Sequence, residues 1–427
     1  MSPLADKLAP DRGDGEGALP HRRYPTLLDS LLLVPARRAL RQLLDAIGRP
    51  PLAFVLWNGQ EVTATDAPVA RVVFHDSATL TEVAANPFYA FGEAYADGRV
   101  DVEGDLAKLL TVTFQHTRAW QKKGANVLQT AARILQPRRN TLAASRENIH
   151  HHYDIGNDFY RLWLDEALVY TCAYFAQSSM TLEQAQRAKM DHICRKLRLL
   201  PGQSVIEAGC GWGAMALHMA RHYGVNVRAF NISHEQITYA RSRSREEGLD
   251  DQVEFIEDDW RNICGQCDSF VSVGMLEHVG LENYRLLGDV IDRCLTDDGC
   301  GLIHSIGRNR PDALNPWIEQ RIFPGAYPPA MSEITNVLEP HRLSILDVEN
   351  LRLHYAQTLR YWLRRYEDSI DQVHRMFDDS FARSWRLYLA GSIAAFESGD
   401  LQLFQILFTR EANNDIPWTR AELYAEP

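Results

Sequence analysis

The pattern of apolar and polar positions changes near residue 140. Beyond it, short apolar runs of strand length alternate with longer amphipathic stretches of helix length. We predict helices at 150–164 and 181–199, followed by strands at 204–208, 225–230, 253–256, 270–273 and 301–305. Helices ending near 220 and 247, and one beginning at 283, separate these strands. Such alternation predicts parallel βαβ units, and therefore an α/β fold with a doubly wound sheet covered by helices on both faces.

The first 140 residues predict a smaller α+β module. An amphipathic helix is expected over 25–47, kinked or divided by Pro35, with Arg37, Arg38 and Arg41 on its polar part. Strands at 53–57 and 69–74 and helices at 80–97 and 106–135 complete the module. We therefore expect a disordered lead-in over 1–24, an N-terminal domain over 25–140 that associates with lipid or membrane, and a catalytic domain over 141–427.

Composition and charge narrow the class of protein. The 427 residues are 45% hydrophobic and 24% charged, as in ordinary globular proteins, and the net charge of −11 argues against a nucleic-acid partner. Residues 106–146 nevertheless carry eight basic side chains and no acidic one. They predict either a solvated helical face or a surface for anionic phospholipid headgroups. No apolar run is long enough to cross a membrane, and residues 1–21 lack the pattern of a signal peptide.

The seven cysteines have no framework spacing, which is typical of a reduced, cytoplasmic protein. Cys264 and Cys267 form a CxxC pair, but no second pair or histidine stands at zinc spacing. We expect no metal site.

A loop with three glycines follows the first strand of the alternating part, in the segment VIEAGCGWG that begins at Val205. Gly209, Gly211 and Gly213 allow a tight turn and close approach of a ligand to the backbone. The spacing differs from the GxGxxG of dinucleotide sites, and the GK[ST] of a P-loop is absent. With the acidic Glu207 ahead of it, this loop favours S-adenosylmethionine as the cofactor.

Residues after the next two strands are candidates for the rest of this cofactor site. Asn231 and Gln236 lie where the ribose hydroxyls are expected, with Ser233 between them. Asp259 and Trp260 follow the third strand, where an acid and an aromatic ring can bracket adenine. Taken alone, Trp260 could be a core aromatic, but its position after the strand favours contact with the ligand.

Several motifs, in consistent order from residue 147 to the C-terminus, resemble those of cyclopropane-fatty-acyl-phospholipid synthases and the related mycolic acid cyclopropane synthases. They are HHYDIGND from His151, YTCAYF from Tyr170, the glycine loop, SVGMLEHVG from Ser272, LIHSIG from Leu302 and YAQTL from Tyr355. The resemblance implies a Rossmann-like methyltransferase domain with helical lid insertions, and cofactor contacts from Tyr170 and Thr171.

The resemblance also implies a reaction: transfer of a methylene group from S-adenosylmethionine to a cis double bond in a phospholipid acyl chain. A bound bicarbonate would act as the base, held by Cys172, Glu277, His304, Ile306 and Tyr355. Their chemistry is suitable, because backbone N–H groups, a tyrosine hydroxyl and a histidine can donate to an oxyanion while a glutamate accepts its O–H. A homodimer associated peripherally with the inner face of the cell membrane is also implied.

Some assignments stay open. Tyr174, Phe175, Tyr284, Trp317, Phe323 and Tyr361 could line an acyl-chain tunnel or belong to the core, and Arg308, Arg310 and Arg321 could meet a lipid phosphate or solvent. Glu207, Leu276 and Asn231 replace residues more usual in the family. Three other functions compete: a related fatty-acyl methyltransferase giving a methyl-branched or methylene product, a lipid-binding scaffold with a dead site, and a methyltransferase for small molecules or nucleic acid.

Overall fold

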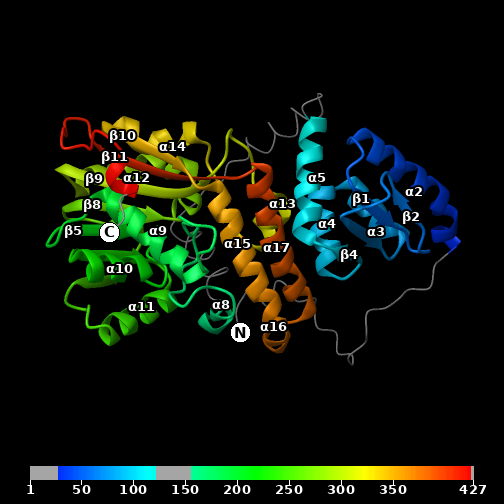
Figure 1. Cartoon of the computed structure of the whole chain (residues 1–427), viewed down its shortest axis with the longest axis horizontal. Coiled ribbons are helices and arrows are strands. Elements are labelled where there is room, and N and C mark those ends of the chain that lie inside the picture. The colour runs from blue at the N-terminus through cyan, green and yellow to red at the C-terminus, as the bar shows by residue number, and fades with distance from the viewer. Residues whose placement is uncertain (1–26, 122–154, 425–427) are drawn as a thin grey trace. The chain divides into compact units, whose positions relative to one another are not determined.

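The computed structural model describes residues 27–121 and 155–424 (Figure 1). These residues pack into two compact units. The first contains residues 27–121, 314–324 and 362–400, and the second contains residues 155–313, 325–361 and 401–424. The predicted domain boundary at residue 140 therefore does not separate the two units completely, because the later segments 314–324 and 362–400 belong to the first unit. The predicted lead-in, the helix start at 150 and most of the basic stretch 106–146 lie outside the described residues.

The first unit contains a four-stranded sheet in the order β2-β1-β3-β4. Its strands are β1 (Leu52–Val55), β2 (Glu61–Thr63), β3 (Ala70–Phe74) and β4 (Val100–Gly104). β1 pairs antiparallel with β2 and parallel with β3, and β3 pairs antiparallel with β4. The turn at Asn58-Gly59 joins β1 to β2, with Gly59 at a φ of 83°.

Helices cover this sheet and complete the first unit. α2 (Leu27–Ala46) continues through Pro35, and Leu40 and Leu44 pack with Leu56 and Val62. The helix expected over 80–97 is two helices, α3 (Ser77–Ala85) and α4 (Pro87–Ala96). Asn86 leaves helical geometry between them, and Pro87 can begin a helix but cannot continue one. The other helices are α5 (Leu106–Gln121), α13 (Pro316–Arg321), α16 (Ile370–Met376) and α17 (Asp379–Ser398).

The second unit is built on a seven-stranded sheet in the order β10-β11-β9-β8-β5-β6-β7. The strands are β5 (Ser204–Ala208), β6 (Asn226–Asn231), β7 (Val253–Glu257), β8 (Cys267–Val273), β9 (Leu295–Gly307), β10 (Leu343–Asn350) and β11 (Gln402–Arg410). β5 to β9 are parallel, which confirms the predicted doubly wound α/β fold. The antiparallel strands β10 and β11 are an addition that the alternation did not predict.

Successive residues of the central strands enter two separate cores, because side chains alternate between the faces of a sheet. Val205 and Val271 pack on one face, whereas their neighbours Ile206 and Phe270 pack on the other. Helices α9 (Leu182–Leu197), α10 (Ala214–Tyr223) and α11 (His234–Glu246) contribute to the first core, and α12 (Tyr284–Cys294) and α14 (Met331–Leu338) to the second.

Shorter elements complete the second unit: α8 (Asn157–Arg161), η1 (Trp260–Asn262), η2 (Leu276–His278), η3 (Leu281–Asn283), η4 (Glu339–His341) and α18 (Ala421–Tyr424). The long helix α15 (Arg352–Asp368) begins in the second unit and ends in the first. The turns that follow β5 to β9 all lie at one edge of the parallel sheet, which is where ligands bind in folds of this kind.

Candidate active site

The glycine loop after β5 has a backbone that only glycine adopts easily. Gly209, Gly211 and Gly213 have φ angles of 84°, 53° and 83°. A Cβ atom on Gly213 would lie 2.6 Å from the ring of Phe255, and one on Gly209 would lie 3.0 Å from Met275, so these two glycines are needed for packing. Gly211 borders open space instead. It is the position at which a ligand can approach the backbone.

Glu207, two residues before the loop, is a buried carboxyl. Burial raises its pKa to about 7, against the opposing charge of Lys189, and its Oε2 atom has no hydrogen-bond partner in the structure. A buried unpartnered acceptor is costly unless a ligand satisfies it. Glu207 is therefore suited to accept a hydrogen bond from a cofactor at the loop.

A hydrogen-bonded pair follows β6. The side-chain nitrogen of Asn231 donates to Oε1 of Gln236 at 2.7 Å and to the carbonyl of Gly211 at 3.2 Å. These bonds fix the orientation of the Gln236 amide and leave its buried Nε2 without a partner. A ribose hydroxyl can accept from that nitrogen. Ser233 acts differently, because its hydroxyl caps α11 by accepting the backbone N–H of Gln236.

Asp259 and Trp260 follow β7 as predicted, and both are buried. Both carboxylate oxygens of Asp259 lie 3.0 Å from the guanidinium of Arg261, which also stacks over the indole of Trp260 at 4.6 Å. Trp260 belongs to the core that includes Phe230 and Ile263. The contact of these two residues with adenine stays a prediction.

The turn after β8 and the last residues of β9 bring a carboxyl and an imidazole toward the same edge of the sheet. Glu277 lies in η2, and the backbone N–H of Ile306 donates to its Oε1 at 2.6 Å. Burial raises the pKa of Glu277 to about 7 and lowers that of His304 well below its usual range. Glu277 Oε2 and His304 Nε2 are both buried without a partner. The pair can offer one acceptor and one donor to a small ligand.

Cys172 and Tyr355 come from two segments that run side by side in the second unit. The N–H of Ala173 donates to Oγ1 of Thr358 at 3.0 Å, and the N–H of Phe175 donates to Nδ1 of His354 at 3.0 Å. Burial raises the pKa of the Cys172 thiol far above its ordinary value. The thiol is therefore protonated, so Cys172 can contribute its backbone N–H but not a thiolate.

Comparison with known proteins decides the family. The model for mycolic acid cyclopropane synthetase matches residues 140–406, and a domain of unknown function matches residues 39–124. The cyclopropane-fatty-acyl-phospholipid synthase of Escherichia coli K12 is 38% identical over 334 residues, which cover 76% of this chain and 84% of that relative. The chain belongs to the mycolic acid cyclopropane synthetase family. It is an S-adenosylmethionine-dependent methyltransferase, as the resemblance of its motifs implied.

Other relatives and solved structures agree. A probable fatty acid methyltransferase of Pseudomonas putida is 34% identical over 387 residues, covering 88% of this chain and 96% of that one. The cyclopropane synthase MmaA2 of Mycobacterium tuberculosis is 28% identical with a TM-score of 0.60, covering 62% of this chain and 98% of that one. The mycolic acid cyclopropane synthase CmaA1, complexed with SAH and CTAB, is also 28% identical, with a TM-score of 0.59 and coverage of 62% and 98%.

Lys189 is a residue of this methyltransferase site that the sequence reasoning missed. Its ammonium donates to Oγ1 of Thr171 at 2.9 Å, and burial lowers its pKa to about 8. Its charge favours ionisation of Glu207 and opposes protonation of His304. A signal was present, because Lys189 interrupts the apolar stripe that Ala185 and Ile193 form on α9.

The remaining predicted residues divide between the units. In the second unit, Tyr174 stacks on His192 at 4.3 Å, Phe175 stacks on Tyr361 at 5.7 Å and Tyr284 is buried in the core. Tyr170 packs against Tyr160 and Trp163 at 5.5 and 5.2 Å. Arg308 is buried with Asp312 at 3.9 Å, and Arg310 is exposed.

Three of the predicted residues belong to the first unit instead. Trp317 donates to Oε1 of Glu93 at 2.9 Å, and the guanidinium of Arg321 donates to the same carboxylate. Phe323 meets the ring of Tyr388 edge-on at 5.4 Å. These contacts give Trp317, Arg321 and Phe323 structural roles. A lipid-binding role stays a prediction.

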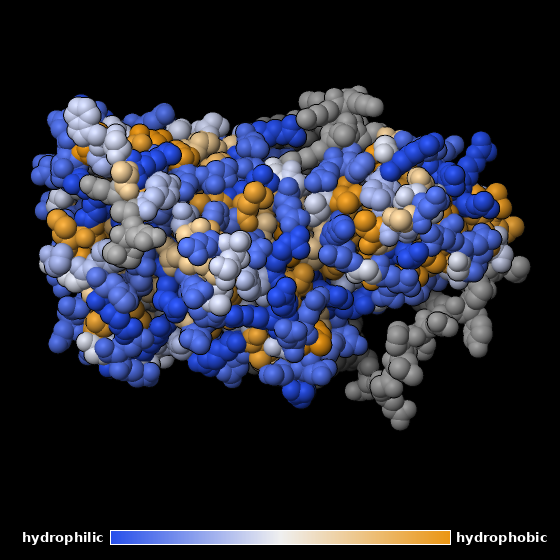
Figure 2. All heavy atoms as spheres, viewed as in Figure 1, coloured by the Kyte–Doolittle hydropathy of each residue, from blue (hydrophilic) through white to orange (hydrophobic). Residues whose placement is uncertain are grey.

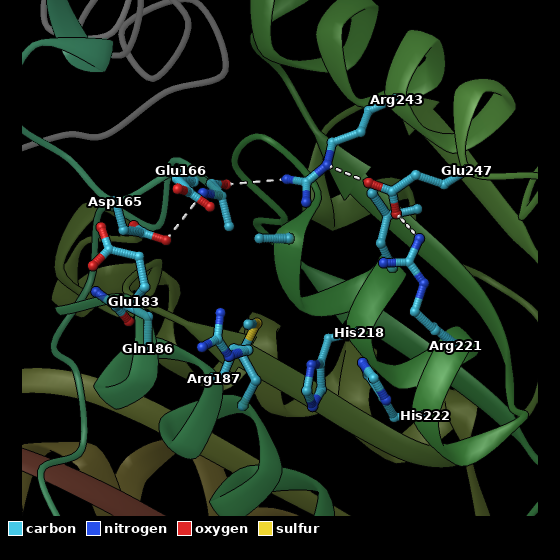
Figure 3. A pocket seen from close by; sticks show the side chains of 14 residues that line it. Asp165, Glu166, Glu183, Gln186, Arg187, His218, Arg221, His222, Arg243 and Glu247 are labelled. Atoms are coloured by element: carbon cyan, nitrogen blue, oxygen red, sulfur yellow. Dashed lines mark hydrogen bonds and ion pairs between the residues drawn. The ribbon is translucent and has the colours of Figure 1, made fainter. Parts of the chain in front are cut away.

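A separate pocket of about 210 Å³ lies beside α9, α10 and α11 (Figure 3). None of the predicted site residues lines it. Within its lining, Arg221 and Arg243 both pair with Glu247, and the Asp165 carboxylate accepts from the backbone of Ala167. Its polar lining does not suit an acyl chain. Among the described residues, no group of three or more His, Cys, Asp or Glu side chains could hold a metal ion.

The buried carboxyl of Glu277 predicts a pH-dependent stability. Its pKa rises from 4.5 to about 7 on folding, so the folded state holds this proton more tightly than the unfolded chain. The free energy of unfolding therefore falls as pH rises from 4.5 to 7, by roughly 3 kcal/mol in all. Glu277→Gln keeps an oxygen for Ile306 and removes this penalty.

We expect Glu277→Gln to stabilise the ligand-free protein at pH 8, by up to roughly 3 kcal/mol, and to change it little at pH 4.5. Denaturant unfolding at both pH values measures this difference. Glu254→Gln, at an exposed position in β7, is the matched control and should show no pH-dependent gain. An equal gain at both pH values for Glu277→Gln would contradict the assignment.

Proposed function

We propose that this methyltransferase transfers a methylene group from S-adenosylmethionine to a cis double bond of an unsaturated phospholipid acyl chain, with bicarbonate as the base. Lipid methylation follows from the family, whose members include cyclopropane synthases and fatty acid methyltransferases. The finer assignment is supported by one observation: an unpartnered acceptor at Glu277 Oε2 and an unpartnered donor at His304 Nε2, both buried at the edge of the sheet that carries the glycine loop.

The chemistry requires such a pair. The alkene attacks the sulfonium methyl, the C–S bond breaks, and a carbocation remains on the acyl chain. Loss of a proton from the new methyl then closes the ring, because the C–H electron pair forms the third C–C bond. When bound, bicarbonate would supply the base for this step. The protein has to orient the alkene, exclude water and hold the base in place.

The described residues fit an oxyanion that carries one O–H. Glu277 in its charged form can accept that O–H, and His304 can donate to an oxygen. The N–H of Ile306 holds the Glu277 carboxylate in position. Direct bonds from Cys172 and Tyr355 to bicarbonate stay part of the proposal, and one from Ile306 would require its N–H to turn from Glu277 to the anion. Lys189 adds a positive charge close enough to act on Cys172 and His304.

The second candidate is methylation of the same alkene with a methyl-branched or methylene product. The similarity to the probable fatty acid methyltransferase of Pseudomonas putida and to a tuberculostearic acid methyltransferase of Mycobacterium tuberculosis, 32% identical over 378 residues, favours it. Ring closure and the methylene product both require loss of a proton from the cation, so a bound base supports either of them over a saturated methyl-branched product, which would need a hydride donor.

Incubation with ¹³C-methyl S-adenosylmethionine and vesicles of a defined cis-monounsaturated phospholipid decides between the products. We expect proton NMR of the extracted lipid to show the high-field signals of a cyclopropane ring. Olefinic methylene or branched-methyl signals in their place would overturn ring formation. In the same assay, removing dissolved bicarbonate should slow turnover, and adding it back should restore the rate.

We also propose that the first unit contacts the inner face of the cell membrane peripherally, from the cytoplasm. We propose further that the enzyme is a homodimer. No helix among the described residues is long and apolar enough to cross a bilayer. The basic residues between 122 and 146, on which the membrane contact was predicted, lie outside the described residues. α2 offers a surface that is described: Leu31 and Val34 are 72% and 77% exposed, and hydrophobic atoms reach the surface in its region (Figure 2).

The same face of α2 continues into Arg38 and Arg41, which are exposed. Apolar side chains followed by arginines on one helix face are typical of helices that lie in an anionic membrane surface. The apolar residues would enter the acyl boundary while the guanidinium groups meet phosphates. This arrangement would bring the enzyme to its substrate.

Replacing Leu31 and Val34 by Asp should therefore weaken binding to vesicles containing anionic phospholipid, by about tenfold or more. Sedimentation with vesicles measures binding, and calorimetry should show unchanged affinity for S-adenosylhomocysteine. Leu200→Asp, at a 62% exposed leucine of the second unit, is the matched control. Equal vesicle binding by the double variant and the control would rule out α2 as the membrane surface.

A further inference from the structure

We propose that Gln405 is a positioning residue, oriented by Lys196, that holds the neutral imidazole of His304 in the tautomer with its proton on Nε2. The inference rests on the proposed function, because it explains how the donor aimed at the anion is maintained. Neither residue was among the candidates from the sequence, and both lie in the second unit.

The register of the sheet places Gln405 beside His304. β11 runs antiparallel to β9, next to it in the sheet (Figure 1), and Gln405 is the residue opposite His304. Both side chains are buried, at 0% and 1% exposure. The amide nitrogen of Gln405 lies 3.2 Å from Nδ1 of His304.

The direction of this hydrogen bond follows from the other end of the amide. Lys196 Nζ lies 2.8 Å from Oε1 of Gln405, and an ammonium can only donate. The oxygen of the amide therefore faces Lys196, and its NH₂ group faces His304. Since the NH₂ group donates, Nδ1 must accept, and a neutral imidazole then carries its proton on Nε2.

Lys196 is itself held in place. Its ammonium also donates to Oε2 of Glu349 at 2.6 Å, and Nε2 of His192 lies 2.7 Å from the same oxygen. Burial opposes ionisation of Glu349, but the bonds from His192 and Lys196 outweigh it and lower the pKa of Glu349 to about 2. Burial lowers the pKa of Lys196, and the charge of Glu349 opposes this, so the buried ammonium has a counter-charge while it orients Gln405.

The tautomer of His304 decides whether its Nε2 atom offers an N–H donor or a lone pair to a ligand. With the proton on Nε2, His304 has a buried N–H donor two residues before Ile306, whose backbone N–H binds Glu277. With the proton on Nδ1, it would present a lone pair and repel an anion. Burial lowers the pKa of His304 well below its usual range, so the imidazole stays neutral and only one of its two nitrogens carries a proton. Gln405 and Lys196 together would set the affinity for the anion without touching it.

The test uses two variants. Gln405→Leu removes the donor to Nδ1. Gln405→Glu keeps an acceptor for Lys196 but has no N–H to donate to Nδ1. Long-range ¹H–¹⁵N NMR of ¹⁵N-histidine protein reports the tautomer, with the His304 signals assigned by their loss in His304→Asn. In the wild type we expect Nε2 protonated and Nδ1 unprotonated. In Gln405→Glu we expect the proton on Nδ1.

Kinetics give a second readout that a purely structural role would not change. For Gln405→Leu, the bicarbonate concentration at half-maximal turnover should rise about tenfold, with affinity for S-adenosylhomocysteine unchanged. Gln402→Leu is the matched control, since Gln402 is a buried glutamine of the same strand that lies opposite Gly307. It should leave the bicarbonate dependence unchanged. If Gln405→Leu does not fold, Lys196→Met tests the same point, because the amide then loses its fixed orientation.

The outcomes separate this inference from the proposed function. Wild-type turnover that ignores bicarbonate would overturn the proposed base, whatever the tautomer. A wild-type His304 protonated on Nδ1, or a Gln405→Leu enzyme with the wild-type bicarbonate dependence, would overturn the positioning role even where the wild type needs bicarbonate.

Discussion

The candidate site depends on the pairing of β9 with strands on both sides. Its parallel neighbour β8 places Val273 beside His304, so that the turn after β8 carries Glu277 to the end of β9. Its antiparallel neighbour β11 places Gln405 beside the same histidine. A shift of one residue in either pairing would move these side chains to the opposite face of the sheet. The register of the strands therefore determines which side chains lie beside His304.

Burial has two opposing effects on this site. It raises the pKa of Glu207 and Glu277 and lowers that of Lys189, so each buried charge reduces the stability of the ligand-free protein. The same burial removes competing water and strengthens every hydrogen bond made to a ligand. An unpartnered acceptor at Glu207 and an unpartnered amide at Gln236 are costs that a bound cofactor would offset. The site is arranged for binding at the expense of stability.

The sequence predicted the parallel part of the fold because its signal is local. Apolar runs such as 204–208, separated by helices and glycine turns, define βαβ units without reference to distant contacts. β10 and β11 were not predicted, since the helices α15 to α17 separate the two strands along the chain. The prediction of a single helix over 80–97 was wrong, because Pro87 begins a new helix there. The free-energy cost of a proline inside a helix is larger than the gain from a continuous apolar stripe.

The same distinction applies to the site. The positions of Glu207, Asn231, Glu277 and His304 near the carboxyl edge could be predicted, because Glu207, Asn231 and His304 lie in the last residues of β5, β6 and β9, and Glu277 follows β8. Ser233 was predicted to contact the cofactor, which stays a prediction, and its capping bond emerged only from the geometry of α11. Lys189 left a signal as a charge within an apolar stripe. Gln405 left none, because its importance comes from the residue opposite it on another strand.

We propose that Glu277 and His304 form an acceptor and a donor for bicarbonate that are already in place in the ligand-free protein. Calorimetric titration of bicarbonate into the complex with S-adenosylhomocysteine, at pH 8, tests it most directly. We expect saturable binding at one site in the wild type and its loss in both Glu277→Ala and His304→Ala. Absence of saturable binding to the folded wild type, or undiminished binding to both variants, would contradict it.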